Sequence, residues 1–248
     1  MQLKCQNIVA QCCDAFVEIG TEATSSDQRR ALDLLFNVYE QQLKDLEADH
    51  ISTTGTLSIE CRAMNNLVIL VSLLTVQVFH FYSHTDVTFD GPLSRLLSTS
   101  CTVISLISNL LQTTTFPPSP PVFVVYALMQ STFSLLRIIK SPVSGGVDLD
   151  RAASHLSLGI GLVKQPAMHN NYASARMGVV LTQLWSSPNV LRRDDGSEDL
   201  GVKARKRLML GPVLDFIWRY YDLVDEQHKR PGEARRGMSP LAFQYWQY

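Results

Sequence analysis

Histidine has the widest chemical range of the residues in this chain, because it can bind a metal or transfer a proton near neutral pH. The sequence contains six histidines: His50, His80, His84, His155, His169 and His228. Only His80 and His84 are spaced to share one face of a helix, and Asp86 is the single acidic or cysteine residue just after them. A structural zinc site usually has four protein ligands. We therefore expect the histidines to be hydrogen-bonded or exposed, and we expect no metal site.

Sequence patterns of the common catalytic sites are absent. The chain contains no G-x-S-x-G turn, no P-loop and no dinucleotide-binding fingerprint. Gly159-Ile160-Gly161 lies within a helical pattern, where glycine permits close packing of helices. Carboxylates are scarce inside the apolar segments, which removes most options for general acid–base catalysis. We expect that the protein is not an enzyme and that this chain holds no cofactor.

The cysteines do not form the paired C-x-x-C spacing of a zinc site. All five lie within apolar helical patterns: Cys5, Cys12, Cys13, Cys61 and Cys101. We expect buried free thiols in a reducing compartment. The N-terminus also lacks the continuous apolar run of a signal peptide.

The run Lys203-Ala204-Arg205-Lys206-Arg207 is the one local cluster of positive charge. Such a run can be a nuclear-import signal, a phosphate contact or the solvated first turn of a helix. The net charge of the whole chain is −1, which argues against nucleic-acid binding by the chain as a whole.

The stretch 116–140 predicts the central helix of the fold. Its proline cluster (117–121) cannot lie inside a helix but can lead into one, and residues 122–139 are apolar on almost every side. Arg137 and Lys140 fall in the last turn, where cations complement the helix dipole, and Pro142 ends the helix. A helix that is apolar all round must be buried in protein or in lipid.

The rest of the chain also shows helical periodicity, and no strand-like alternation persists. Two helices are predicted by their start signals: one follows a capping box at Ser25–Gln28, and one begins at Asp90. Asp148 is a good N-cap for a helix over residues 149–164. The other predicted helices cover residues 3–19, about 56–82, 173–185 and about 200–226. These patterns predict an all-α fold: a single large multi-helix domain (1–227) of about eight helices, with buried apolar central helices. Residues 228–248 are expected to form a flexible C-terminal tail.

Two charge-free regions, 63–82 and 96–136, raise the alternative of a membrane protein. The first contains six polar side chains that are costly in hydrocarbon unless paired: Asn65, Asn66, Ser72, Thr75, Gln77 and His80. The second is broken by the proline cluster, and no asymmetry of Lys and Arg marks a cytoplasmic side. Burial inside a large helical domain fits these features better, so no membrane partner is expected.

Ordered motifs in the second half of the chain resemble those of a known family. LLRIIKSP (135–142) ends the central helix, Ala175-Arg176 precedes Leu181-x-x-Leu184-Trp185, and a basic run leads to Leu214-Asp215-x-x-Trp218-Arg219. In order and spacing they are similar to the C-terminal part of the regulatory (middle homology) domain of fungal zinc binuclear-cluster transcription factors. The likeness is greatest to the branch of the leucine-biosynthesis and weak-acid-response regulators, and it covers about residues 5–226.

The resemblance implies the regulatory, effector-sensing region of a transcription factor that controls RNA polymerase II genes in the nucleus. The family's six-cysteine zinc cluster and its coiled-coil linker are absent from this sequence, so zinc and DNA contacts are expected only in that missing N-terminal part. A truncated paralogue, a partial gene model and a natural regulator without the cluster all remain open. The expected partners are a small-molecule effector and the transcription machinery.

Six residues match the family pattern: Arg176, Gln183, Trp185, Arg207, Asp215 and Trp218. We expect structural roles for them, with both tryptophans as helix-packing anchors and Arg176 paired with a carboxylate such as Asp215 or Asp222. The polar residues inside apolar helices are the effector-site candidates: Gln77, His80, Gln130 and Arg137. An anionic effector favours Arg137, or Lys140 near it, because a cation fixes the orientation of a carboxylate.

Two other readings stay open beside the regulator. One is a helical membrane protein, and the other is a stand-alone helical interaction module. The aromatic C-terminus (Phe243, Tyr245, Trp246 and Tyr248) also has two readings, as a transcription-activation segment or as a segment that packs back onto the domain.

Overall fold

The computed structural model describes residues 1–20, 26–53, 58–83, 90–113, 120–141, 148–165, 172–188, 190–191, 202 and 211–229. Within these ranges the chain forms eight longer helices, one four-residue helix and no strand. The all-α class and the helix count of about eight are therefore confirmed. In chain order the helices are α1 (Gln2–Gly20), α2 (Ser26–Thr53), α3 (Ile59–Val78), α4 (His80–Ser83), α5 (Asp90–Thr113), α6 (Val122–Ile139), α7 (Leu149–Val163), α8 (Tyr172–Ser186) and α9 (Gly211–Lys229).

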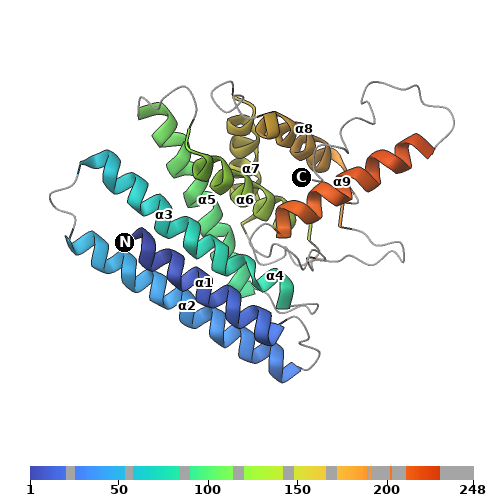
Figure 1. Cartoon of the computed structure of the whole chain (residues 1–248). Helices are drawn as coiled ribbons and strands as arrows, with labels where there is room; N and C mark the ends of the chain where they lie inside the picture. Colours follow the sequence, from blue (N-terminus) through green and yellow to red (C-terminus); the bar gives the residue numbers. More distant parts are fainter. Residues whose placement is uncertain are drawn as a thin grey trace.

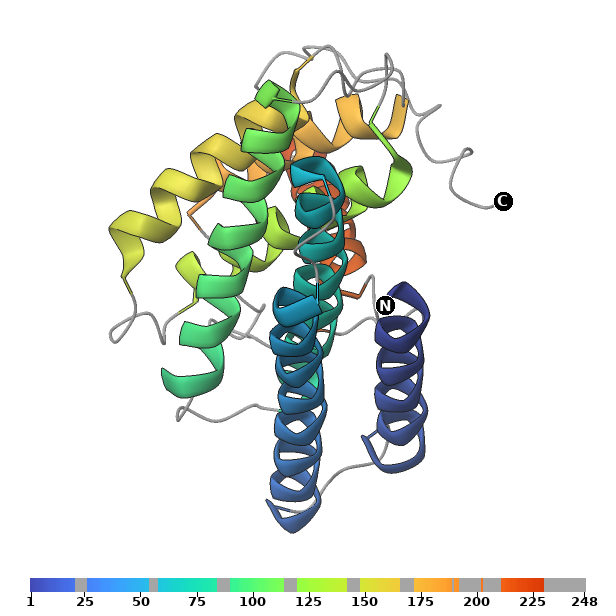
Figure 2. The ribbon, with the colours of Figure 1, turned by 90° about the vertical axis from the view of Figure 1, so that its left-hand side faces the viewer.

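The helices pack mainly on their neighbours along the chain (Figures 1 and 2). At one end of the molecule α1 and α2 lie side by side as a hairpin and both pack against α3. Helices α3, α5, α6 and α7 follow one another, and α8 and α9 close the other end. Helix α9 also returns to pack against α6.

Capping residues explain several helix ends. The Ser58 hydroxyl accepts a hydrogen bond from the Cys61 N–H at 3.2 Å at the start of α3, and the predicted cap Asp148 accepts one from the Arg151 N–H at 3.0 Å. The central helix α6 begins after Pro121 and ends at Ile139, with Lys140 as its C-cap. The predicted helix over 56–82 is shorter, because it breaks at Phe79 and continues as α4.

Two hydrophobic cores share α3 as a common wall. The main core takes Leu67, Leu70, Leu74 and Val78 from α3 and joins them to α5, α6, α7, α8 and α9. The second core, which we call the hairpin core, consists of Cys5, Val9, Cys12, Phe16, Leu32, Phe36, Leu43, Ile69, Leu73, Val76 and Phe79. Because each face of α3 packs on a different core, an apolar sequence all round this helix is required.

Helix α6 is the most buried element near the centre, as predicted for an all-apolar helix. Gly159 of α7 crosses it closely: a Cβ added at Gly159 would lie 2.6 Å from Thr132 Oγ1 and 3.3 Å from Thr132 Cγ2. A Cβ added at Gly161 would have no such neighbouring atom within 4 Å. Glycine at 159 therefore permits the close packing that the sequence suggested, whereas Gly161 has no such role.

The last helix begins later than predicted. Val202 lies outside any helix, with its N–H donating to the Phe81 carbonyl at 3.3 Å, and α9 starts at Gly211. Pro212 stands in the first turn of α9, where a proline lacks only a hydrogen bond that would be unsatisfied anyway. The proposed capping box at Ser25, the basic run 203–207 and the tail from residue 230 lie outside the described residues.

Among the described residues, three stretches are long and apolar enough to cross a membrane, judged by length and composition alone: Ile59–Tyr82, Gly91–Thr113 and Val122–Ile139. In the most apolar window of each, 67%, 56% and 72% of the residues, respectively, are buried inside the protein. Protein neighbours thus cover most of the surface that a lipid phase would otherwise cover.

Candidate functional site

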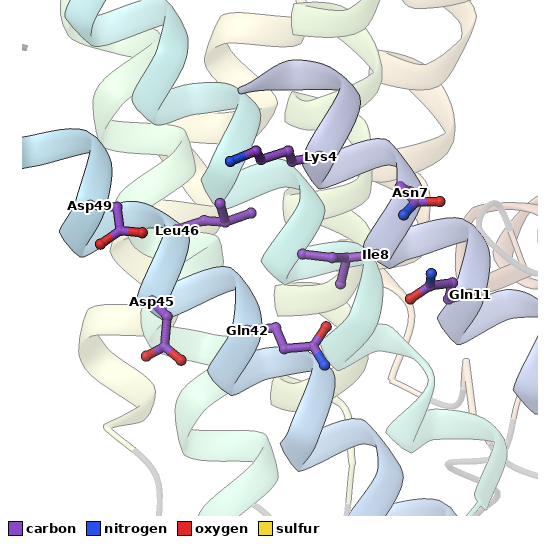
Figure 3. A pocket seen from close by; sticks show the side chains of 8 residues that line it. All are labelled: Lys4, Asn7, Ile8, Gln11, Gln42, Asp45, Leu46 and Asp49. Carbon is purple, nitrogen blue, oxygen red and sulfur yellow. The ribbon is translucent and has the colours of Figure 1, made fainter. Parts of the chain in front are cut away.

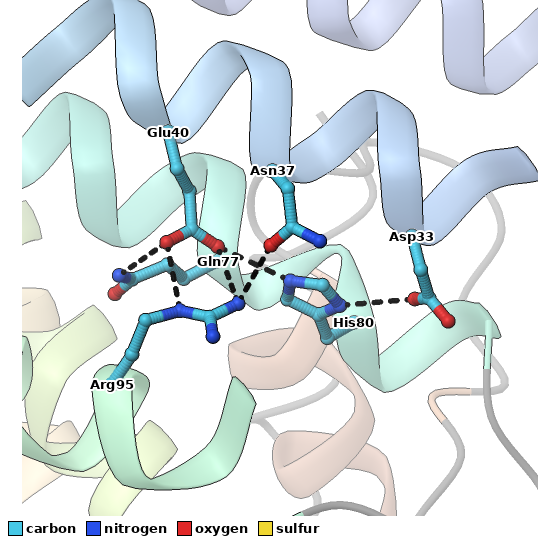
Figure 4. A network of polar contacts seen from close by, with 6 residues as sticks. All are labelled: Asp33, Asn37, Glu40, Gln77, His80 and Arg95. Carbon is cyan, nitrogen blue, oxygen red and sulfur yellow. Dashed lines mark hydrogen bonds and ion pairs between the residues drawn. The ribbon is translucent and has the colours of Figure 1, made fainter. Parts of the chain in front are cut away.

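A cluster of polar side chains, which we call the Glu40 network, joins α2 to the junction of α3 and α4 and to α5 (Figure 4). Its members are Asp33, Asn37, Glu40, Gln77, His80 and Arg95. The three residues from α2 are spaced four and three apart, so they project from one face of that helix. The helix break at Phe79 places His80 at the start of α4, opposite this face.

Glu40 is the centre of the network and is only 2% exposed. Its carboxylate accepts hydrogen bonds from Gln77 Nε2 at 3.2 Å and Arg95 Nε at 3.1 Å, and His80 Nε2 lies 3.3 Å away. Burial alone would raise the pKa of Glu40, but hydrogen bonds from His80 and Arg95 outweigh it and lower the pKa below its ordinary value. The buried carboxylate is therefore ionised and well satisfied.

His80 lies between two carboxylates and is 1% exposed. Its Nδ1 is 3.2 Å from Asp33 Oδ1, and its Nε2 is 3.3 Å from Glu40 Oε1. Because these nitrogens are on different sides of the ring, the two carboxylates do not converge with it on one point in space. Within the described part of the chain, no three or more His, Cys, Asp and Glu residues are arranged to hold a metal ion.

A second cluster, which we call the Asp215 cluster, joins α6 to α9 through Arg137, Asp215 and Arg219. Arg137 is fully buried, and its Nη2 donates to Asp215 Oδ2. Arg219 Nε donates to the same oxygen at 2.9 Å, and Arg219 Nη1 donates to the Val190 carbonyl at 3.1 Å. Burial opposes ionisation of Asp215, but the charges of the two arginines outweigh it and lower the pKa of this carboxyl.

Aromatic rings enclose the buried guanidinium of Arg137. The Phe81 and Phe216 ring centroids lie 5.5 Å and 4.9 Å from its central carbon. Phe216 also stacks on Phe133 of α6, with 5.7 Å between the ring centroids. A cation held between ring faces in a dry interior gains attraction beyond that of its ion pair.

Lys140 lies just past the end of α6 and contacts the end of α8. Its Nζ donates to the carbonyls of Trp185 at 2.8 Å and Ser187 at 2.9 Å. The same ammonium lies 5.1 Å from the Trp185 ring centroid. Burial lowers the pKa of Lys140 from its ordinary value. Lys140 therefore satisfies carbonyls that the end of α8 leaves open, which is a structural role.

Gln130 is the least satisfied polar side chain in the middle of α6. It is fully buried, and neither its Nε2 nor its Oε1 has a hydrogen-bond partner among the described residues. Ser134 Oγ and Ser141 Oγ are also buried and have no hydrogen-bond partner among the described residues. Gln130, Ser134 and Arg137 recur at intervals of four and three residues, so one stripe of α6 presents polar groups to the interior, and Ser141 follows just past the end of the helix.

The effector-site candidates from the sequence separate into distinct places. Gln77 and His80 meet in the Glu40 network, whereas Gln130 and Arg137 lie on the polar stripe of α6. Lys140 is engaged with the end of α8. The sequence suggested one site, and the structure instead distributes these residues among several helix junctions.

The residues that match the family pattern have mixed positions. Asp215 forms an ion pair with Arg137, and Trp185 contacts Lys140 through its carbonyl and its ring. Trp218 is 57% exposed, so the expectation that it anchors helix packing is wrong. Trp218 projects from the side of α9 opposite Tyr220, which is buried.

The other three residues of that pattern carry less information. Gln183 is exposed on α8, and Arg176 is half-buried on the same helix. Asp215 pairs with Arg137 and Arg219, so the suggested pairing of Arg176 with a carboxylate stays a prediction. Arg207, like His84 and Asp86, lies outside the described residues.

Five residues of the two clusters were missed from the sequence: Asp33, Asn37, Glu40, Arg95 and Arg219. Asp33 and Glu40 stand on α2, and charged residues on a helix are usually exposed to solvent. One usable signal was the spacing of Asp215 and Arg219, since residues four apart on a helix are neighbours. Glu40 and Arg95 are 55 residues apart, and no local pattern indicates their contact.

Three surface hollows are lined by described residues. The first, of about 390 Å³, lies between α1 and α2 and is lined by Lys4, Asn7, Ile8, Gln11, Gln42, Asp45, Leu46 and Asp49 (Figure 3). The second, of about 380 Å³, lies between α8 and α9 beside Gln183 and Tyr220. The third, of about 430 Å³, lies where Arg62 and Asn66 of α3 face His50 of α2. None of the five effector-site candidates lines these three hollows.

Comparisons with protein-family models, with curated proteins and with solved structures found no match to this chain.

Proposed function

We propose that this chain is the effector-sensing regulatory region of a fungal transcription factor of the zinc binuclear-cluster class. In this proposal it works in the nucleus and contacts the transcription machinery. It reaches DNA only through an N-terminal zinc-cluster domain that this sequence does not contain. The order of the motifs from residue 135 to residue 219 supports the proposal, and an all-α domain is compatible with it.

The observation that carries the proposal is the buried ion pair of Arg137 and Asp215. These residues come from two different motifs, the exit of α6 and the Leu-Asp-x-x-Trp-Arg segment of α9, and they are 78 residues apart. A buried pair of charges is stable only while both partners are present. The junction of α6 with α9 is therefore a place where one new charge can change the packing of a helix.

A small organic anion can act on this junction by competing with Asp215 for Arg137. An anion that binds more tightly when α9 has moved shifts the population toward that state. The size of the shift is set by the difference between its affinities for the two states. Moving such an equilibrium from 1:99 to 99:1 requires about a 10⁴-fold difference in affinity. Gln130 and Ser134 on the same stripe of α6 offer the hydrogen-bonding groups for the uncharged part of such a molecule.

Calorimetry and thermal shift against a panel of small organic acids test the site. We expect binding by the wild type, loss of binding in Arg137→Ala, and unchanged binding in Arg151→Ala, which removes an exposed arginine of α7. Arg137→Gln, which keeps much of the side-chain volume, guards against an unfolded variant. Equal binding by the wild type and by folded Arg137 variants would contradict this site.

A reporter assay in fungal cells tests the function itself. The chain is fused to an unrelated DNA-binding module, and reporter output is measured with and without the organic acids. We expect output that responds to an acid and depends on Arg137. A reporter that stays silent with every fusion and every acid contradicts the regulator, and the stand-alone interaction module then becomes the better reading.

A membrane protein is the second candidate, because three stretches are apolar and long enough to span a bilayer. Glu40, Arg137 and Asp215 argue against it, since each is at most 2% exposed inside the protein and pairs with another protein group. Extraction of cell membranes with carbonate separates the two. A spanning protein stays in the pellet, whereas the proposed regulatory region is released.

A further inference from the structure

The hairpin of α1 and α2 is held by its own core. Its buried residues pack against one face of α3, and the rest of the protein packs on the other face. Phe16, Phe36 and Phe79 form the end of this core next to α4, and Tyr82 of α4 packs on both this core and the main core. The hairpin can therefore leave α3 without disturbing the main core, provided that its other attachments to α3, α4 and α5 are released.

The Glu40 network supplies those attachments. It links α2 to His80 of α4, to Gln77 of α3 and to Arg95 of α5. Both nitrogens of the His80 ring face carboxylate oxygens, at 3.2 Å and 3.3 Å. A neutral imidazole carries one N–H, so it can donate to only one of these two acceptors. Both contacts are attractive only when the ring carries two protons and a positive charge.

Among the described residues of the Glu40 network, the charges balance when His80 is protonated. Asp33 and Glu40 of α2 supply two negative charges, Arg95 of α5 supplies one positive charge, and protonated His80 supplies the second. The Cys12 thiol of α1 also faces Glu40, and burial raises its pKa, so it adds no charge. Loss of the His80 proton leaves a ring lone pair facing a carboxylate oxygen, beside the buried charge of Glu40.

We propose that deprotonation of His80 releases the hairpin of α1 and α2 from α3 as a unit, while the main core stays folded. The hairpin is thus a pH-sensitive flap that is closed in neutral and mildly acidic solution and opens under alkaline conditions. This inference stands apart from the proposed function, and the failure of either leaves the other intact.

The direction of the pH dependence follows from the environment of His80. Burial alone would lower its pKa, but the hydrogen bonds and charges of Asp33 and Glu40 outweigh burial and raise the pKa above the ordinary value. The protonated ring therefore contributes its full stabilisation below the pKa of the open state, about 6.5. That contribution is lost as the pH rises through the higher pKa of the closed state.

The cysteines of the chain provide reporters for the experiment. Cys5 and Cys12 are buried in the hairpin core, Cys101 is buried in the main core, and Cys61 is exposed. Brief alkylation with iodoacetamide from pH 6 to pH 9, followed by mass spectrometry, gives the rate at each thiol. The rate at each buried cysteine is divided by the rate at Cys61. This ratio removes most of the intrinsic effect of pH on thiolate formation.

For the wild type, we expect the ratio of the Cys12 rate to the Cys61 rate to rise with pH. The rise should be about tenfold for each unit by which the closed state raises the pKa of His80. The Cys101 ratio should stay flat. A flat Cys12 ratio overturns the proposal, and so does a Cys101 ratio that rises in parallel, because parallel rises mean opening of the whole domain.

Variants assign the effect to His80. In His80→Gln, which is neutral at every pH, the Cys12 ratio should already be high at pH 6 and should not change further. His155→Gln removes a half-buried histidine whose ring bonds Arg151 and Ser105, and it should behave as the wild type does. If His80→Gln does not fold, Asp33→Asn replaces it and should shift the transition to lower pH. An unshifted transition in folded variants at positions 80 and 33 would overturn the assignment.

Discussion

Arg137 of α6 and Asp215 of α9 form a buried ion pair that is shared with Arg219. The Arg137 side chain is fully buried, and that of Asp215 is 3% exposed. Because Arg219 also donates to Asp215, two cations depend on one carboxylate. The carboxylate of Asp215 is therefore the group on which this junction depends most.

Asp215→Asn should destabilise the protein by about 3–5 kcal/mol, because it leaves Arg137 as a buried charge without its anionic partner. The free energy of unfolding, measured by urea titration, checks this value. Asp225→Asn on the exposed side of α9 is the matched control and should change stability by less than about 0.5 kcal/mol. Similar effects of the two variants would show that the pair contributes little.

Acid should destabilise the wild type through the same carboxylate. Since the arginines lower the pKa of Asp215, its stabilisation is present above the pKa of the unfolded state and is lost as the pH falls through the folded-state pKa. Urea titrations between pH 7 and pH 3 should show a smaller loss of stability in Asp215→Asn than in the wild type. Equal losses would place the acid response elsewhere, for example at Glu40, whose pKa is also lowered.

Gln130→Met should stabilise the protein. The substitution keeps a similar volume and removes a buried amide that has no hydrogen-bond partner among the described residues, a group whose desolvation costs about 1–3 kcal/mol. Thermal or urea unfolding measures the gain, and Gln183→Met at an exposed position is the control. Loss of stability in Gln130→Met would mean that water or a ligand satisfies this amide in solution. If Gln130 contacts the proposed effector, the more stable variant should also bind it more weakly.

Gly159→Ala and Gly161→Ala form a matched pair on one helix. The first places a methyl group against Thr132 and should cost about 1–3 kcal/mol, as overpacking of a core does. The second meets no neighbour and should gain up to about 1 kcal/mol from the higher helix propensity of alanine. Adding Thr132→Ala to Gly159→Ala should recover most of the loss, and a double-mutant cycle measures this coupling.

Local signals in the sequence predicted much of the fold. The proline cluster and Pro142 bounded α6, Asp148 was recognised as a cap, and Asp90 opened α5 where expected. Each signal acts through backbone geometry over a few residues. The last helix was predicted from about residue 200, but Val202 lies outside any helix, and α9 is described from Gly211, with Pro212 in its first turn.

The contacts of the candidate site could be predicted only in part. Arg137 and Gln130 stood out because polar groups are rare in an apolar helix. Their surroundings did not, because the pairing of Arg137 with Asp215 depends on how α9 returns to α6. Trp218 shows the opposite error: a large aromatic residue suggested a packing anchor, but its place on the helix turns it outward.

The polar stripe of α6 has a further consequence during synthesis. A nascent chain that has not yet made α9 carries α6 as an isolated apolar segment, which resembles the segments that the cell inserts into membranes. Gln130 near the middle of this segment and Arg137 toward its end both lower the tendency to insert. The unpartnered Gln130 amide, which costs stability in the folded protein, would thus favour release of the chain into water, so Gln130→Met would increase mis-targeting to membranes.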